Sequence, residues 1–479
     1  MSLKEKTING VLWTFTDLFL VKGLSFAAML FLARWLGPKD FGLIGMVAIF
    51  IAIGTTLIDS GLAASLIRTA KVASIDFSTV FYMNIAVGLL AYLLLYTIAP
   101  IIANFFDQFL LVAILRVYSL IFLISATTSV QLAILQKEMA FKKLTLLNVP
   151  STLLGVTVGL FLGYNGYGVW SIVWMYLTIQ TVLSLLLWST ASWRPNLSFS
   201  KQKLQQHFSF GYKLMLSSLL NTIFNNSYNV IIGKFFPVQI LGFYERAQRF
   251  CEYPSMTITG IIEKVTYPML ARLQEDVPRL SNIYQKILKV TFFITAPLML
   301  GASALAKPLF LLILGVEWLS AVPYFQILSL AYMLYPLHAF NLNVLKVFGR
   351  SDLFLKLEVI KKIIIVFGLF IGFQFGILGL LWGAVGSSFI ALFVNMFYSS
   401  RLIHYSSSQQ IGDMLPILIS ALLVASLMFY GVTFLEDYSN LNQIIMISVV
   451  GTIVYVSIYA IHKMSPLYML LDLIKNKSL

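Results

Sequence analysis

The 479-residue sequence is 59% hydrophobic and only 11% charged, and its formal net charge is +14. A soluble domain carries roughly 25% charged residues, so this composition excludes a water-soluble protein and predicts that lipid is its outer solvent. The positive charge does not indicate nucleic-acid binding, because the Lys and Arg residues lie between apolar runs, where topology determinants belong. A single cysteine, Cys251, excludes an intramolecular disulfide and a cysteine metal site.

Hydropathy predicts an all-α integral membrane protein with fourteen spans, since each span needs about 20 apolar residues. The first span is expected to stay uncleaved, because Asp17 and Lys22 interrupt it and no small-residue cleavage site follows. An even number of spans puts both termini on one side. The predicted spans are 9–32, 41–66, 77–103, 110–136, 144–165, 167–190, 208–233, 239–263, 287–306, 319–345, 353–374, 376–400, 414–434 and 443–462.

The distribution of positive charge then predicts which side the termini occupy. With a cytoplasmic N-terminus, 24 of the 33 Lys and Arg residues lie on the inner side, 6 lie within or at the end of spans, and only Arg34, Lys39 and Lys234 lie outside. The inner count includes four residues at the inner ends of spans (Lys289, Lys356, Lys361 and Lys362), and the span count includes Lys307. An excess of Lys and Arg over short loops marks the cytoplasmic side. Both termini are therefore predicted to be cytoplasmic.

The sequence contains a weak internal repeat at an offset of about 200 residues. ARWLGPKDFGLIG (33–45) matches GKFFPVQILGFYE (233–245), and GYNGYGVWSIVW (163–174) is echoed by GFQFGILGLLWG (372–383). Two six-span halves have the same orientation, so they are expected to be related by a pseudo-two-fold axis along the membrane normal. We expect an N-terminal lobe, a C-terminal lobe, and two additional spans with a cytoplasmic tail. These are placed at 1–205, 206–405 and 406–479.

The sequence lacks the motifs of several kinds of functional site. It has no GxxxxGK[ST] phosphate loop, and its four histidines are scattered without metal-ligand spacing, so no catalytic residue, metal or cofactor is predicted. His338 is interpreted as a hydrogen-bonded packing residue rather than a proton relay. All outer loops are short, which argues against a polymerase with an extracytoplasmic catalytic loop.

Segments along most of the chain resemble one family of transporters. They are RWLGPKDFGLIGMV (34–47), DSGLAASLIR (59–68), LGFYERAQRF (241–250), YPMLARLQED (267–276), LGVEWLSAVPYFQIL (314–328) and, more weakly, GRSDLFLK (349–356). They are similar to the polysaccharide-transport branch, the Wzx-like exporters, of the multidrug/oligosaccharidyl-lipid/polysaccharide flippase superfamily.

The resemblance implies a two-lobed, fourteen-helix fold with a central cavity open to one side at a time. It implies a cargo of undecaprenyl-diphosphate-linked oligosaccharide, moved to the outer leaflet of the bacterial inner membrane, and therefore a transporter rather than an enzyme. Membrane lipids, and the polysaccharide polymerase and glycosyltransferases of the same pathway, would be its partners. The family has no short catalytic signature that could be carried over to individual residues.

Charged residues inside the predicted eighth span are candidate functional residues, because each costs about 2.5–3.5 kcal/mol at a span centre. Arg249 lies four residues after Glu245 and three before Glu252, so these acids share its helix face and predict local ion pairs. No acid stands three or four residues from Arg246, which makes Arg246 the better candidate for binding an anionic substrate.

The first two spans contribute three more candidates. Lys22 lies near the middle of span one, and Asp17 is five residues earlier, about 140° around the helix. Lys22 is a candidate for binding diphosphate, and Asp17 is a candidate for coupling a cation or for pairing with another helix. Asp59 either takes part in ion coupling or caps or kinks span two near its inner end.

Three amides in span seven, Asn221, Asn225 and Asn229, follow one another at four-residue spacing and are predicted to form one stripe. Amides both donate and accept hydrogen bonds, which suits a path for sugars, but they also join helices in membranes. Two other functions compete with the flippase reading: a cation-coupled multidrug exporter of the same superfamily, and a membrane polysaccharide polymerase or ligase.

The charge asymmetry makes sidedness testable with single cysteines in a Cys251→Ser background. Cysteines beside Lys142, Lys203 and Arg350 should be protected from an impermeant thiol reagent in intact spheroplasts. Cysteines placed in the outer loops at Lys39, Glu317 and Asp437 should react. Labelling of the first group in unbroken spheroplasts would invert the topology.

Overall fold

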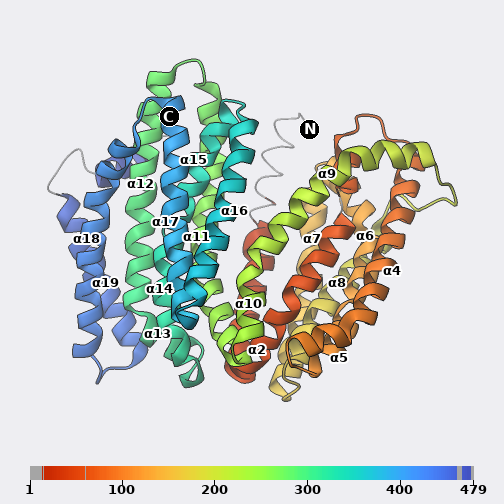
Figure 1. Ribbon diagram of the computed structural model, residues 1–479, viewed down its shortest axis with the longest axis horizontal. Coiled ribbons are helices and arrows are strands. Elements are labelled where there is room, and N and C mark those ends of the chain that lie inside the picture. Colours follow the sequence, from red (N-terminus) through yellow and green to blue (C-terminus); the bar gives the residue numbers. More distant parts are fainter. Residues whose placement is uncertain (1–12, 14–15, 60, 461–465, 476–479) are drawn as a thin grey trace. The chain divides into compact units, whose positions relative to one another are not determined.

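The computed structural model describes residues 13, 16–59, 61–460 and 466–475, and these contain helices and no strand (Figure 1). The predicted start of the first span at 9–12 and end of the last at 461–462 lie outside the described residues. By compactness the chain divides into two units, Met1–Gly242 and Phe243–Leu479.

The first unit contains long helices joined by short connections. Its elements are η1 (Leu18–Lys22, a short π-helix), α2 (Gly23–Asp59), α3 (Leu62–Arg68), α4 (Ser74–Phe105), α5 (Leu110–Tyr118), α6 (Leu120–Lys137), α7 (Phe141–Tyr164), α8 (Trp170–Thr190), α9 (Lys201–Asn225) and α10 (Ser227–Phe235). Helix α11 (Val238–Arg272) begins in this unit and continues into the second.

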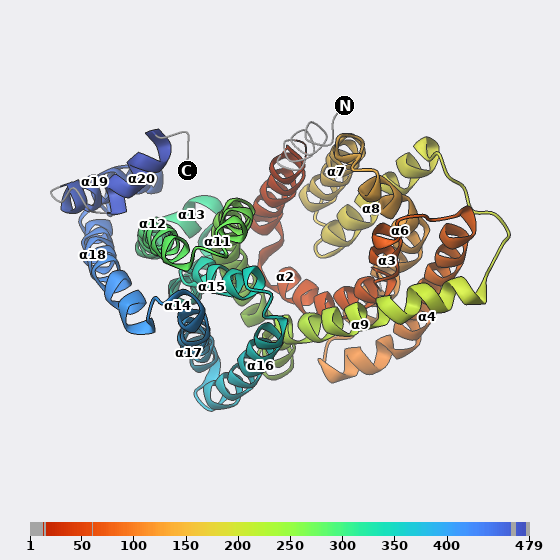
Figure 2. The ribbon, with the colours of Figure 1, turned by 90° about the horizontal axis from the view of Figure 1, so that it is seen from above.

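The second unit adds a short 3₁₀ turn and nine helices. They are α12 (Val277–Ala304), α13 (Ala306–Ile313), η2 (Val316–Ala321), α14 (Val322–Tyr332), α15 (Tyr335–Val347), α16 (Ser351–Phe373), α17 (Gly376–Ile403), α18 (Ser407–Phe434), α19 (Asn440–Ala460) and α20 (Pro466–Lys475). Viewed along the helices, α18, α19 and α20 lie at one edge of this unit (Figure 2). The sequence did not predict α20, which packs against α12 and α19.

Within the described residues, nine helical segments are long and apolar enough to cross a membrane, and one of them, Leu20–Arg68, covers two predicted spans. Four predicted spans lie on other helices: α9 with α10, α11, α14 with α15, and α16. The predicted span on α14 and α15 is interrupted between two helices, while α11 and α16 carry several charged residues. The described helices therefore accommodate every predicted span without fixing their number.

The side chains of α4 are distributed in the opposite way to those of a helix on a soluble protein. Leu90 and Ile101 are 67% and 68% exposed, whereas Thr79 and Asn84 are fully buried. Asn84 Nδ2 donates to Ser129 Oγ on α6 at 2.5 Å. A helix that exposes its apolar residues and buries its amides is suited to a lipid exterior.

The two copies of the internal repeat meet at their glycines. Helix α2 bends sharply at Gly37 (φ 75°, ψ 174°), just before Pro38. A Cβ added to Gly42 would lie 1.9 Å from the Val238 carbonyl oxygen, and a Cβ added to Gly242 would lie 1.9 Å from the Pro38 carbonyl oxygen. The contact is reciprocal at the offset of 200 residues, as in a two-fold contact in which the same patch is used twice. We call it the glycine crossing.

Compactness and the repeat assign α9 and α10 differently. The two helices contact α2, and α9 also contacts α3 and α4, so compactness groups both with the first unit. The repeat groups them with the second half, beginning at residue 206. The two criteria measure different properties, and the division at 205, 206 and 405 stays a prediction.

The glycine crossing predicts a large effect from one added methyl group. Gly42→Ala and Gly242→Ala each force backbone apart, so each should lower the free energy of unfolding by about 1–3 kcal/mol. Gly412→Ala is the matched control, since a Cβ there has no heavy atom within 4 Å. Thermal denaturation of the purified protein in detergent measures the effect. Equal melting temperatures for all three variants would show that the crossing is not tightly packed.

Candidate functional site

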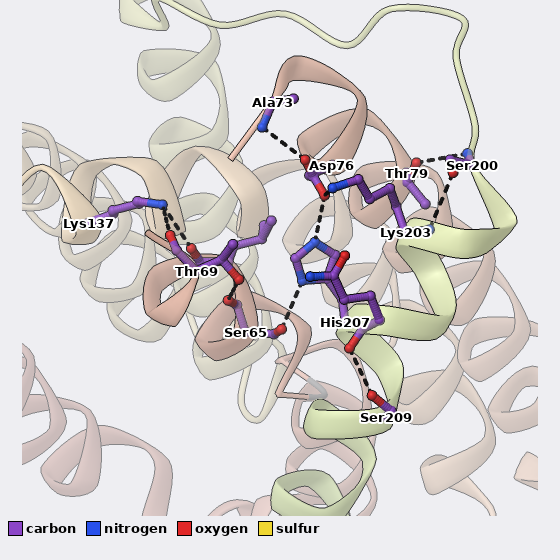
Figure 3. Close-up of polar contacts among 12 residues, drawn as sticks. Ser65, Thr69, Ala73, Asp76, Thr79, Lys137, Ser200, Lys203, His207 and Ser209 are labelled. Carbon is purple, nitrogen blue, oxygen red and sulfur yellow. Dashed lines mark hydrogen bonds and ion pairs between the residues drawn. The ribbon is translucent and has the colours of Figure 1, made fainter. Parts of the chain in front are cut away.

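A buried polar network joins α3, α4 and α9 in the first unit (Figure 3). The His207 ring, which is completely buried, lies between two partners: Nδ1 is 2.8 Å from Ser65 Oγ, and Nε2 is 3.1 Å from Asp76 Oδ1. The same Asp76 oxygen forms an ion pair with Lys203 Nζ at 3.1 Å. Asp76 is 1% exposed, so its charge is compensated inside the protein.

Local sequence explains how these groups converge. Asp76 is the third residue of α4, and its Oδ2 accepts the Ala73 backbone N–H at 2.9 Å, so the carboxylate also lies at the positive end of the helix dipole. Lys203 and His207 are four residues apart on α9 and therefore share one face. Ser200 caps α9 by accepting the Lys203 N–H at 3.3 Å.

The connection into α9 is fastened to α4 by side-chain hydroxyls. Ser78 Oγ accepts the Asn196 N–H at 3.1 Å, and Thr79 Oγ1 accepts the Ser200 N–H at 3.0 Å. On the other side, Lys137 of α6 donates to the carbonyls of Leu66 (3.2 Å) and Thr69, and so closes the end of α3. The network therefore holds together four helices, α3, α4, α6 and α9.

Reasoning from the sequence did not find this network. The sequence neighbours of His207 offer no metal-ligand spacing, whereas its partners are 131 and 142 residues away. A usable signal was the pair Lys203 and His207 on one helix face, opposite an acid at the start of another helix. That pairing becomes visible only when the packing of α9 on α4 is known.

A second charged group lies on α11, in the second unit. Arg249 Nη1 is 2.9 Å from Glu252 Oε2, and its Nε is 3.8 Å from Glu245 Oε2, as their spacing predicts. Arg246 and Glu245 are 7% and 8% exposed. The neighbouring Gln248 donates to the Tyr332 hydroxyl at 3.1 Å. This part of α11 thus carries two buried charges, Glu245 and Arg246, and one exposed arginine, Arg249.

The candidates from the first two spans lie in different surroundings. Asp17 Oδ1 accepts the Asn148 amide of α7 at 3.0 Å, which supplies the interhelical partner that the sequence left open. Lys22, at the end of η1, is exposed. Asp59 is exposed at the end of α2. The structure therefore does not bring these three charges into one cluster.

The three predicted amides do not share one environment. The regular helix is interrupted at Asn226 (φ −102°, ψ 5°), where α9 gives way to α10. Asn221 and Asn225 precede the interruption and are exposed, whereas Asn229 follows it and is 6% exposed. The expectation of one continuous stripe is thus wrong, because the three amides do not lie on one uninterrupted helix.

His338 is hydrogen-bonded on both ring nitrogens: Nε2 is 3.1 Å from Ser388 Oγ, and Nδ1 is 3.1 Å from Asn395 Nδ2. Because the NH₂ group of Asn395 can only donate, Nδ1 accepts from it, and the neutral ring then carries its proton on Nε2. The prediction that His338 is hydrogen-bonded is confirmed by these contacts, and its role in packing rather than in proton transfer stays a prediction.

The second unit also contains an apolar cavity of about 230 Å³. None of the ten candidate residues lines it. Its lining comes from α12, α17, α18 and Leu334, and consists of Phe292, Leu334, Phe389, Leu392, Phe393, Met396, Ile411, Met414, Leu415 and Leu418.

Comparison with known proteins assigns the chain to a family. The model of a family described as "Polysaccharide biosynthesis protein" matches residues 31–323, more than half of the chain. The chain belongs to this family. The finding agrees with the resemblance seen in the sequence, and together with its apolar helices it makes the chain a multi-pass membrane protein.

This chain is similar over most of its length to relatives from three bacteria. It is 25% identical over 413 residues to the lipopolysaccharide biosynthesis protein WzxC of Escherichia coli K12, covering 86% of this chain and 84% of WzxC. It is 24% identical to the teichuronic acid biosynthesis protein TuaB of Bacillus subtilis 168 (74% and 73% covered). It is 26% identical to the succinoglycan biosynthesis transport protein ExoT of Rhizobium meliloti 1021 (69% and 67% covered).

Solved structures share the fold at lower identity. The lipid II flippase MurJ, in an inward closed conformation, superposes with a TM-score of 0.75 at 16% identity, covering 95% of this chain and 99% of MurJ. An inward-facing multidrug resistance transporter of the MATE family gives a TM-score of 0.62 at 17% identity, covering 83% of this chain and all of its own. The chain therefore has an all-helical MurJ/MATE-like fold.

The contacts of Arg249 predict a structural rather than a substrate-binding role. Arg249→Gln removes both ion pairs and should lower stability by about 1 kcal/mol or less, because the arginine is more than half exposed. The melting temperature should fall by a few degrees while transport is retained. Arg350→Gln, which removes the ion pair to the exposed Asp352, is the control and should have a smaller effect. Loss of transport at an unchanged melting temperature would instead assign Arg249 to the substrate.

Proposed function

We propose that the protein is a flippase that moves an undecaprenyl-diphosphate-linked oligosaccharide from the cytoplasmic to the outer leaflet of the bacterial inner membrane. Membership of the polysaccharide biosynthesis family, in a multi-pass membrane chain, carries the proposal. The names of three relatives refer to chemically different polymers: lipopolysaccharide, teichuronic acid and succinoglycan. A lipid-linked repeat unit is a form of cargo that such pathways can have in common.

The proposed architecture is that of fourteen spans, with two six-helix lobes at 1–205 and 206–405 followed by two further helices. The glycine crossing supports the repeat, because residues 38 and 42 contact residues 238 and 242 reciprocally. Both termini are cytoplasmic in this proposal, as the asymmetry of Lys and Arg indicates. Transport would follow alternating access, in which the two lobes rock around the substrate.

In this mechanism the cations act on the diphosphate. A guanidinium engages phosphate oxygens with two parallel hydrogen bonds, whereas an ammonium acts as a point charge, so Arg246 would fix orientation and Lys22 would add attraction. Burial strengthens an electrostatic contact, which favours Arg246 as the stronger of the two. The amides Asn221, Asn225 and Asn229 would bind sugar hydroxyls.

The remaining candidates would serve coupling or structure. Asp17 and Asp59 would take part in ion coupling or hold neighbouring helices, and Glu245, Arg249 and Glu252 would form a structural group. The protein would be a transporter and not an enzyme. Its partners would be the lipid-linked oligosaccharide, membrane lipids, and the polymerase and glycosyltransferases of the same pathway.

A multidrug exporter is the nearest competing function, since it shares the fold. Cationic drugs favour acidic and aromatic groups, whereas the buried Arg246 favours an anionic cargo. The fold likeness is also greater to MurJ, in both TM-score and the share of this chain that is covered.

Diphosphate recognition is tested by removing the two cations together. The Lys22→Gln, Arg246→Gln double variant should reduce surface polysaccharide at least about tenfold in a flippase-null strain, the effect of losing one charge-assisted hydrogen bond. Arg246→Lys should restore only part of the activity. Lys307→Gln is the control, because Lys307 forms an exposed ion pair with Glu436. Wild-type polysaccharide from the double variant at normal protein abundance would refute diphosphate binding by these residues.

A further inference from the structure

Helix α9 contacts the rest of the first unit along one narrow stripe of its surface. Of its 25 residues only His207 and Gly211 are buried. The backbone of Gly211 lies against Gly61, where an added Cβ would be 2.4 Å from the Gly211 carbonyl oxygen. Further along the same face, Thr222 Oγ1 is 3.2 Å from Thr56 Oγ1 of α2. A helix with few buried side chains can separate from its neighbours at a lower free-energy cost than a core helix.

The two ends of the α9–α10 segment are held by different kinds of contact. Beyond α10 the chain enters the glycine crossing, where backbone atoms touch without an intervening side chain. At the start of α9 the contacts are hydrogen bonds and charges between the side chains of Ser65, Asp76, Lys203 and His207. Polar groups can exchange these partners for water, whereas tight backbone packing has no such replacement.

The charged residues around His207 come from its own helix and from the helices that surround it. Helix α4 supplies Asp76, α9 supplies Lys203, and α3 supplies Arg68, whose guanidinium lies 4.5 Å from the centre of the Phe210 ring on α9. Lys137 of α6 closes the end of α3, and α2 ends at Asp59. Asp76 is the centre of the arrangement, because it accepts from α9 twice and from the start of its own helix once.

We propose that Ser65, Asp76, Lys203 and His207 form a latch that opens and closes in each transport cycle, while the glycine crossing serves as the pivot. When the latch is closed, the start of α9 is docked on α3 and α4. When it opens, His207 and Asp76 reach water and the start of α9 moves away from α4. The transport step in this inference rests on the proposed function, whereas the opening itself does not.

The first experiment asks whether opening is needed for transport. Ser65→Cys and His207→Cys are combined in the Cys251→Ser background, and this variant complements a flippase-null strain. Transport is measured in inside-out vesicles from that strain, which contain the strain's own radiolabelled lipid-linked saccharide. A short bifunctional methanethiosulfonate reagent should bridge the two thiols during turnover and lower transport at least about tenfold. Dithiothreitol should restore transport, and the monofunctional methyl reagent should leave it within about twofold.

Each other result has a defined meaning. Thiols that stay unmodified during turnover would show that the latch never opens, and full transport by the bridged protein would show that opening is not required. Either result overturns the proposal. Absence of transport in untreated wild-type vesicles would instead refute the proposed function, and the latch would still be tested by the second experiment.

The second experiment measures opening without any substrate. Asp76→Asn should raise the deuterium uptake rate of residues 201–213 by about tenfold or more in purified full-length protein, since charge-assisted hydrogen bonds to α9 are lost. Asp413→Asn is the matched control, because Asp413 forms a comparable ion pair with Lys289 at 2.9 Å in the second unit. It should leave α9 unchanged. Unaltered uptake in α9 of Asp76→Asn would overturn the latch.

Discussion

A polar side chain on a helix surrounded by hydrocarbon must find its partner inside the protein, and the described helices are organised around that requirement. Asn84 reaches Ser129, and His338 lies between Ser388 and Asn395. In a medium that supplies no water, each such contact replaces hydration that the group would otherwise lose. The positions of these partners therefore determine which helices pack together.

The same requirement attaches the C-terminal helices to the second unit. Asp413 of α18 accepts from Gln285 (2.6 Å), Lys289 (2.9 Å) and the Tyr405 hydroxyl (2.5 Å), which joins α18 to α12. On α19, the Tyr455 hydroxyl donates to the Phe293 carbonyl at 3.1 Å. The apolar cavity lies beside α12 and α18, so these helices combine a polar attachment with an apolar recess.

Polar attachment and glycine packing give the first unit two kinds of contact with different mechanical properties. The glycine crossing holds backbones so close that no side chain fits between them, and such packing is rigid. The network around His207 depends on groups that water can also satisfy, so it can open without exposing a large apolar area. A transporter that alternates between two states needs both properties, one to keep its parts in register and one to let them move.

The sequence by itself determined the class of the protein, the approximate positions of its long apolar helices and the family. Composition and apolar run length are one-dimensional properties, and the solvent that they require does not depend on how the helices pack. Local ion pairs were equally accessible, because Glu245, Arg249 and Glu252 are separated by one helical turn. The repeat also marked Gly42 and Gly242 before their reciprocal contact was known.

Only the tertiary structure decided which distant groups meet. His207 has its partners on α3 and α4, more than 130 residues away, and Asp17 pairs with Asn148 rather than with a residue of its own helix. The amides from Asn221 to Asn229 were expected to share one stripe, but the interruption at Asn226 separates an exposed pair from a buried residue. Helical periodicity defines the face on which a side chain lies, whereas its partner depends on which helix is packed against that face, and that information is absent from local spacing.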